Sequence, residues 1–103
     1  MTVRWYPRAK IELMDAANYI KDEYGYKRSR IFLNKVYNAE KQIRYQPRSG
    51  KKEPLLEDTG IEYRSIVIDR LNKIIYWING DVIEIVDFWD NRREPETQAK
   101  RVK

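Results

Sequence analysis

The chain has 103 residues, of which 42% are apolar, 36% charged and 13% aromatic, a composition that predicts one small globular domain. It contains no cysteine and no histidine, which excludes disulfide frameworks, zinc–thiolate sites, Ser-His-Asp hydrolases and Cys-His proteases. The net charge of +5 is uneven, because residues 1–52 carry +8 and residues 53–103 carry −3. A basic half of this kind favours polyanionic partners, although lysine and arginine also solvate ordinary helix faces.

The longest apolar stretches are about six residues, far short of the roughly 20 residues that cross a bilayer. The first residues lack the basic and then apolar pattern of a signal peptide. We therefore expect a cytoplasmic protein.

Residues 3–6 are predicted to form a short strand. From about residue 8 to Tyr24 the apolar residues recur with helical spacing, and Gly25 provides a stop signal. A second amphipathic helix is predicted over about residues 27–45. Two such helices joined by one or two residues form an antiparallel hairpin.

The second half changes to the period of a β-strand. Strands are predicted over residues 61–68, 73–78 and 82–89, with a tight turn at Asn79-Gly80. Strict alternation would place Val82, Glu84, Val86 and Phe88 on one face of the last strand and Ile83, Ile85, Asp87 and Trp89 on the other. The polar tail, about residues 91–103, is predicted to be either a short helix or disordered.

The order β-α-α-β-β-β predicts a single α+β domain over residues 1–103, with the helical hairpin packed on one face of an antiparallel sheet. We expect residues 3–6 to join that sheet, since an isolated short strand needs partners.

Over about residues 2–94 this pattern resembles the RelE/ParE superfamily of bacterial toxins from type II toxin–antitoxin systems. VRWYPRAKIELMDAANYI is similar to the first strand and helix of that family, and EYRSIVIDRLNKIIYWINGDVIEIVDFWDNRRE is similar to its second block. The resemblance implies the same fold and an antitoxin partner. It leaves two activities open, because RelE-like members cleave mRNA in the ribosomal A site whereas ParE-like members poison DNA gyrase.

RNA cleavage requires a deprotonated 2′-hydroxyl, charge stabilisation at the phosphate and a proton for the leaving oxygen. The resemblance makes Arg64, Lys73 and Arg92 candidate catalytic residues, with Arg93 sharing the last role. We expect them to face one side of the sheet and to converge on a phosphate without a metal or cofactor. Glu53 resembles a general base of one subgroup.

Other candidates complete this RNA-cleaving site. Asp90 stands near the position of a histidine acid in relatives and would need a raised pKa to replace it. Lys51 and Lys52 are candidate RNA-binding residues, and Trp89 could stack on an unpaired base. The basic residues of the two helices would hold ribosomal RNA phosphates in a ribosome-bound toxin.

Each candidate also has a structural interpretation. Arg64 and Lys73 can be solvated charges, Arg92 and Arg93 can pair with neighbouring carboxylates, and Trp89 can belong to the core. The retained basic residues favour a ribosome-dependent mRNA endoribonuclease that inhibits translation. The alternatives are a gyrase inhibitor without catalytic activity, which the absence of histidine supports, and a degenerate toxin. In each case the antitoxin should be acidic where it crosses the basic surface.

Overall fold

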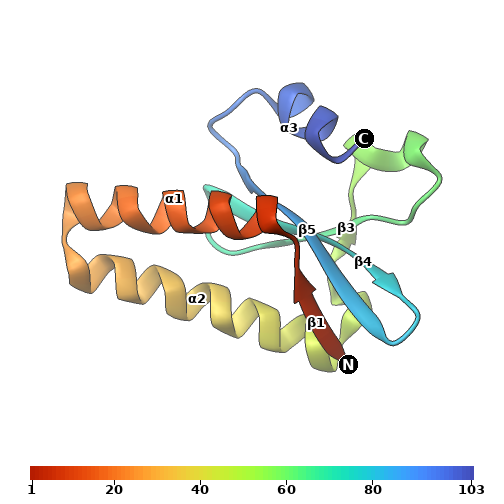
Figure 1. The fold of residues 1–103 in the computed structure, drawn as a ribbon, viewed down its shortest axis with the longest axis horizontal. Helices are drawn as coiled ribbons and strands as arrows, with labels where there is room; N and C mark the ends of the chain where they lie inside the picture. Colours follow the sequence, from red (N-terminus) through yellow and green to blue (C-terminus); the bar gives the residue numbers. More distant parts are fainter.

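The computed structural model describes all 103 residues and confirms the predicted α+β architecture. The elements are β1 (Thr2–Trp5), α1 (Pro7–Tyr24), α2 (Tyr26–Tyr45), the 3-10 helix η1 (Pro47–Ser49), β2 (Lys51–Lys52), the 3-10 helix η2 (Pro54–Thr59), β3 (Arg64–Val67), β4 (Asn72–Asn79), β5 (Val82–Asp90) and α3 (Pro95–Val102). The helical hairpin of α1 and α2 covers one face of a five-stranded sheet of order β1-β5-β4-β3-β2 (Figure 1).

The sheet is mixed rather than wholly antiparallel. Strand β1 joins it as predicted, but it pairs in parallel with β5, with Val3 opposite Ile83. The other strand pairs are antiparallel. The parallel pair arises because the whole helical hairpin and the following strands separate β1 from β5, and this long connection lets the two strands run in the same direction.

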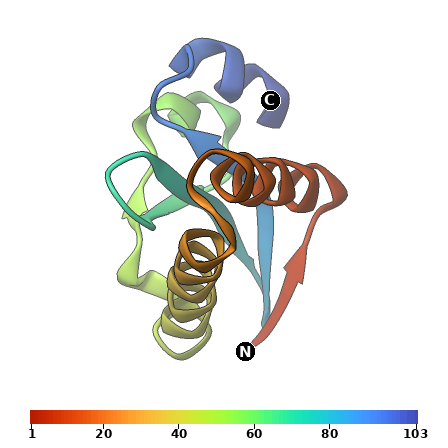
Figure 2. The ribbon, with the colours of Figure 1, turned by 90° about the vertical axis from the view of Figure 1, so that its left-hand side faces the viewer.

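The predicted helix boundaries are correct to within one residue. Pro7 begins α1 at the position where its missing N–H costs nothing, and Gly25 separates α1 from α2 with φ of 96°. The hairpin packs on the sheet through a core that includes Phe32, Ile74 and Phe88. The turn at Gly25 projects beyond the sheet, and Figure 2 shows both helices from this end.

The strict alternation predicted for the last strand is wrong beyond Val86. The β4–β5 register shifts between Ile75, which is opposite Asp87, and Tyr76, which is opposite Ile85, so that Val86 is an extra residue in β5. A bulge of this kind reverses the alternation. Phe88 therefore joins the core under the helical hairpin, and Val86 packs on the opposite face with Trp89.

The second face of the sheet is covered in part by η2 and α3. The tail forms a short helix, one of the two predicted alternatives, and Ala99 of α3 is fully buried in a second apolar cluster with Leu56 and Trp89. The strand predicted from residue 61 begins only at Arg64, because Gly60, with φ of 82°, ends η2 and the chain turns before it reaches the sheet. Neither long helix has the apolar length that a membrane crossing requires.

Candidate functional site

Arg64 holds the loop that follows α2. It lies opposite Tyr76, on the sheet face that the helical hairpin covers, and is only 9% exposed. Its Nη1 donates hydrogen bonds to the backbone oxygen atoms of Gly50 (2.7 Å) and Arg48 (3.2 Å), and its Nη2 contacts Glu62 at 3.1 Å. These bonds direct the guanidinium inward, toward backbone oxygen atoms rather than toward a ligand.

Lys73 lies on the opposite face of the sheet. Its neighbours across the strands are Val67 and Trp89, and the odd-numbered residues of this part of β4 point away from the helical hairpin. The Lys73 ammonium forms an ion pair with Glu53 and lies 5.2 Å from the centre of the Trp89 ring system. Two predicted site residues, Lys73 and Glu53, are therefore brought together.

In the contact between Glu53 and Lys73 the two charges neutralise each other. The Glu53 side chain is 2% exposed and that of Lys73 is 20% exposed. A buried carboxylate is stabilised by its cation, and separating them leaves an uncompensated buried charge. Pairing leaves neither group ready for a phosphate or a 2′-hydroxyl.

Trp89 is not available for base stacking. It is 1% exposed and packs against η2 and α3, and its indole N–H donates to Oδ2 of Asp87 at 2.9 Å. The prediction that Trp89 binds RNA is therefore wrong, because both the ring and its polar atom are engaged inside the protein. Lys51 and Lys52 are exposed on the edge strand β2, where Lys52 pairs with Glu62 at 3.1 Å.

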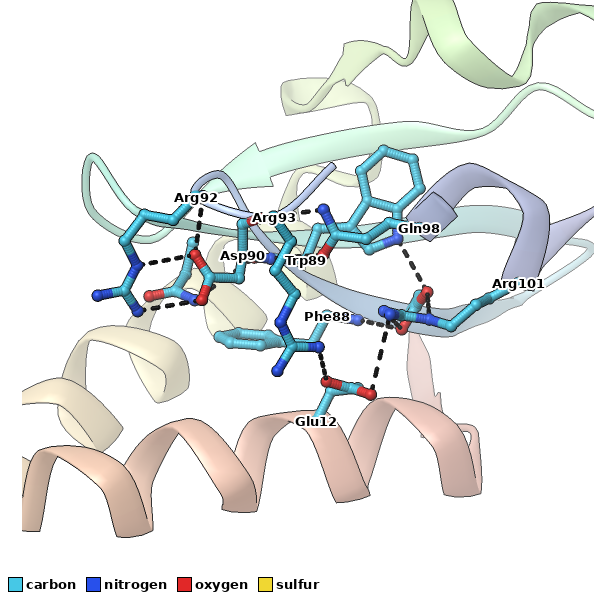
Figure 3. Close-up of polar contacts among 10 residues, drawn as sticks. Glu12, Phe88, Trp89, Asp90, Arg92, Arg93, Gln98 and Arg101 are labelled. Carbon is cyan, nitrogen blue, oxygen red and sulfur yellow. Dashed lines mark hydrogen bonds and ion pairs between the residues drawn. The ribbon is translucent and has the colours of Figure 1, made fainter. Parts of the chain in front are cut away.

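Asp90, the last residue of β5, forms a bidentate pair with Arg92 in the turn that follows (Figure 3). Nε and Nη2 of Arg92 each lie 3.0 Å from a carboxylate oxygen of Asp90, whose Oδ1 also accepts the Arg92 backbone N–H at 2.9 Å. Burial alone would raise the pKa of Asp90, but the hydrogen bonds and charge of Arg92 outweigh it and lower the pKa. Asp90 therefore lacks the raised pKa that the role of general acid would require.

Arg93 also has a carboxylate partner, since its Nη1 lies 3.1 Å from Glu12 of α1. Figure 3 shows Arg93 directed toward Glu12 while Arg92 is directed toward Asp90. The sequence interpretation in which Arg92 pairs with Asp90 is confirmed, whereas the partner of Arg93 comes from a distant helix.

The predicted convergence of Arg64, Lys73 and Arg92 is wrong. Arg64 and Lys73 emerge from opposite faces of the sheet. Asp90, which holds Arg92, is opposite Asn72, while Arg64 is opposite Tyr76, four residues further along β4, or about 13 Å at the rise of a strand. No single phosphate can contact all three cations in this arrangement.

A crevice of about 390 Å³ lies beside Arg92, between α1 and the adjacent ends of the strands. Its walls include the apolar side chains of Tyr19, Ile20, Leu71 and Phe88. Its lining contains four carboxylates, from Glu12, Asp15, Asp69 and Asp90, but only two guanidinium groups, from Arg92 and Arg93. This excess of negative charge disfavours a phosphate there. No group of three or more acidic side chains in the structure is arranged to hold a metal ion.

A charged network that was not predicted from the sequence fixes α3. Arg101 binds both carboxylate oxygen atoms of Asp87, at 3.0 and 3.1 Å, and Asp87 is fully buried. Gln98 exchanges hydrogen bonds with the backbone of Asp90, at 2.8 and 3.0 Å. The signal in the sequence is Asp87 itself, a carboxylate in the middle of an apolar strand, which needs a buried partner.

No protein-family model matches this chain, and no curated protein matches it. Among solved structures, the fold is similar to a chain of the "Chromosomal ParDE TA system from P. aeruginosa", with a TM-score of 0.71 and 16% sequence identity. The match covers 87% of this chain and 95% of that chain. The similarity therefore extends over nearly the whole domain and defines its fold.

Proposed function

We propose that this chain is the toxin of a type II toxin–antitoxin pair and that it inhibits DNA gyrase by binding rather than by cleaving mRNA. Two observations support the toxin assignment. The sequence pattern resembles the RelE/ParE superfamily, and the fold is similar to a chain from a ParDE toxin–antitoxin system. We argue the activity of the toxin from the candidate site, because one fold can host many activities.

The placement of the basic residues favours gyrase inhibition over mRNA cleavage. Metal-free cleavage needs preorganised donors aimed at one phosphate. Here Arg64 and Lys73 lie on opposite sheet faces, and Arg64, Lys73 and Arg92 each contact a carboxylate. Releasing Lys73 from the buried Glu53 would cost several kcal/mol. A toxin that acts by binding has no need for such convergence.

A gyrase assay tests the proposal. Purified gyrase, relaxed plasmid and ATP are incubated with increasing amounts of the protein, and the topoisomers are separated on agarose. We expect supercoiled product to disappear or cleaved complexes to accumulate, and we expect the antitoxin to reverse the effect. Primer extension on an end-labelled message in a purified translation system should show no new ends. Unimpaired gyrase together with ribosome-dependent cuts would establish the endoribonuclease instead.

The proposal also specifies the partner and the compartment. The antitoxin should be acidic where it covers the basic surface, so that added salt speeds its dissociation. Gyrase and the ribosome are both cytoplasmic, and we place the protein there.

A further inference from the structure

The helix α2 carries most of the positive charge of the protein. Among residues 26–45 six are basic and only Glu40 is acidic, a net charge of +5 that equals the net charge of the entire chain. The other helix of the hairpin, α1, has three basic and four acidic residues, a net charge of −1. The hairpin therefore has one strongly basic helix, and its charge is not a general feature of the surface.

The cations of α2 are free, in contrast to those of the candidate catalytic residues. Five of them, Lys27, Arg28, Arg30, Lys35 and Lys41, are exposed and form no ion pair. The sixth basic residue, Arg44, contacts Glu40 at 3.1 Å. Five uncompensated charges on one helix repel one another, and a polyanion laid along the helix would remove that repulsion.

Exposed tyrosine rings lie among these charges. Tyr26, Tyr37 and Tyr45 are 68%, 60% and 73% exposed. Together with Arg30 and Lys41 they follow spacings of four, seven, four and four residues, which keeps all five on one side of the helix. This stripe is about 28 Å long at the helical rise of 1.5 Å per residue. The guanidinium of Arg30 lies 5.9 Å from the centre of the Tyr26 ring.

We propose that this stripe of α2 (Tyr26, Arg30, Tyr37, Lys41 and Tyr45) is a docking surface for single-stranded nucleic acid. Cations bind the phosphates, while aromatic rings stack on unpaired bases regardless of their sequence. A duplex hides the faces of its bases, and an acidic peptide offers no planar ring for each tyrosine. The combination of free cations and exposed rings therefore favours a single strand. The inference does not depend on gyrase being the target, and the acidic antitoxin proposed above would compete with the strand for this basic helix.

Fluorescence anisotropy with a labelled 20-nucleotide oligothymidylate tests the charges of the stripe. We expect binding by the full chain with a slope of log Kobs against log salt of about −1.4, as phosphate contacts of the two cations of the stripe, Arg30 and Lys41, would give. Arg30→Gln/Lys41→Gln should make the slope less steep by about 1.4. The matched control Lys10→Gln/Lys21→Gln removes the same charge from exposed positions of α1, and should leave the slope nearly unchanged. Equal effects of the two double variants, or no binding at low salt, would overturn the proposal.

A second comparison tests the rings. Tyr37→Leu should weaken oligothymidylate binding about fivefold, the effect of losing one stacked base. Tyr19→Leu, which alters an exposed tyrosine of α1, should have little effect, and circular dichroism should confirm that both variants fold. Duplex binding as tight as single-strand binding would overturn the proposal in favour of a backbone contact. Equally effective competition by polyglutamate, charge for charge, would overturn it in favour of an acidic protein segment.

Discussion

Arg64 and Lys73 lie on adjacent antiparallel strands but project from opposite faces of the sheet. The register that pairs Arg64 with Tyr76 and Val67 with Lys73 fixes this relationship. A shift of one residue would place the two cations on the same face, because side chains alternate along a strand. The connection between β3 and β4 sets this register. In the observed register the two cations lie on different faces and form no basic pair.

Gly50 is predicted to be intolerant of a side chain. A Cβ atom there would lie 2.5 Å from the hydroxyl oxygen of Tyr76 and 2.8 Å from the backbone oxygen of Ser65. The Tyr76 hydroxyl cannot easily move, since it donates to the Pro47 oxygen at 2.6 Å and accepts the Gly50 N–H at 3.0 Å. We expect Gly50→Ala to lower the free energy of unfolding by about 2–3 kcal/mol in urea denaturation.

Gly60→Ala is the control for this prediction. No atom lies within 4 Å of its added Cβ, and the cost arises only from the positive φ of 82°, about 1 kcal/mol. Equal losses in the two variants would show that the loop after α2 adapts to the methyl group.

The buried pair of Glu53 and Lys73 is predicted to be structural. Lys73→Met leaves the Glu53 carboxylate buried without its cation, and we expect a loss of about 3 kcal/mol of unfolding free energy. The double variant Lys73→Met/Glu53→Leu should recover most of that loss, because it removes the isolated charge. Chemical denaturation measures both. Failure of the second substitution to restore stability would contradict the assignment of a buried, mutually compensating pair.

The bond between Arg101 and Asp87 should anchor the C-terminal helix. Arg101→Gln removes the cation from a fully buried carboxylate that keeps only its bonds from Phe88 and Trp89. We expect a loss of about 3 kcal/mol of unfolding free energy. Lys103→Gln breaks the exposed contact with Asp58 and should cost about 0.5 kcal/mol or less. Comparable urea midpoints for these variants would refute the anchoring role.

Glu84 is predicted to contribute to acid sensitivity. The hydrogen bond from Arg4 outweighs burial and lowers the pKa of Glu84, a residue that is 1% exposed. A carboxylate with a lower pKa in the folded state stabilises the protein above its unfolded pKa, near 4.3, and this stabilisation is lost as the pH falls through the folded pKa.

Thermal melts between pH 7 and pH 3 test this pH dependence. Glu84→Gln should be less stable than the wild type at pH 7, with a smaller loss of Tm on acidification. Glu23→Gln, at an exposed position without an ion pair, should follow the wild type. Parallel curves for Glu84→Gln and the wild type would contradict the prediction.

Local signals in the sequence predict the fold well. Gly25 marks the helical hairpin because its positive φ suits a turn, and Asn79-Gly80 marks the strand hairpin for the same reason. The bulge at Val86 and the docking of α3 escape prediction, since each depends on packing between distant segments. In α3 one buried alanine, Ala99, and one buried ion pair fix a segment whose composition is otherwise that of a solvated tail.

The candidate site is less predictable than the fold. The residue types that resemble a ribonuclease are present, but their roles depend on strand register and on partners remote in the sequence. Lys73 pairs with Glu53, which is 20 residues away in the sequence, and Arg93 pairs with Glu12, which is 81 residues away. Single-sequence periodicity contains no information on these contacts, and the neutralisation of the cations becomes visible only in three dimensions.

The most direct test of a binding toxin is the gyrase supercoiling assay performed with the wild-type protein and with Arg92→Ala. Arg92 is bound to Asp90 in an exposed turn, and the variant should fold. We predict that both proteins inhibit gyrase to a similar extent, since no catalytic cation is required. Undiminished supercoiling with the wild type, alongside ribosome-dependent message cleavage that Arg92→Ala abolishes, would contradict the proposed function.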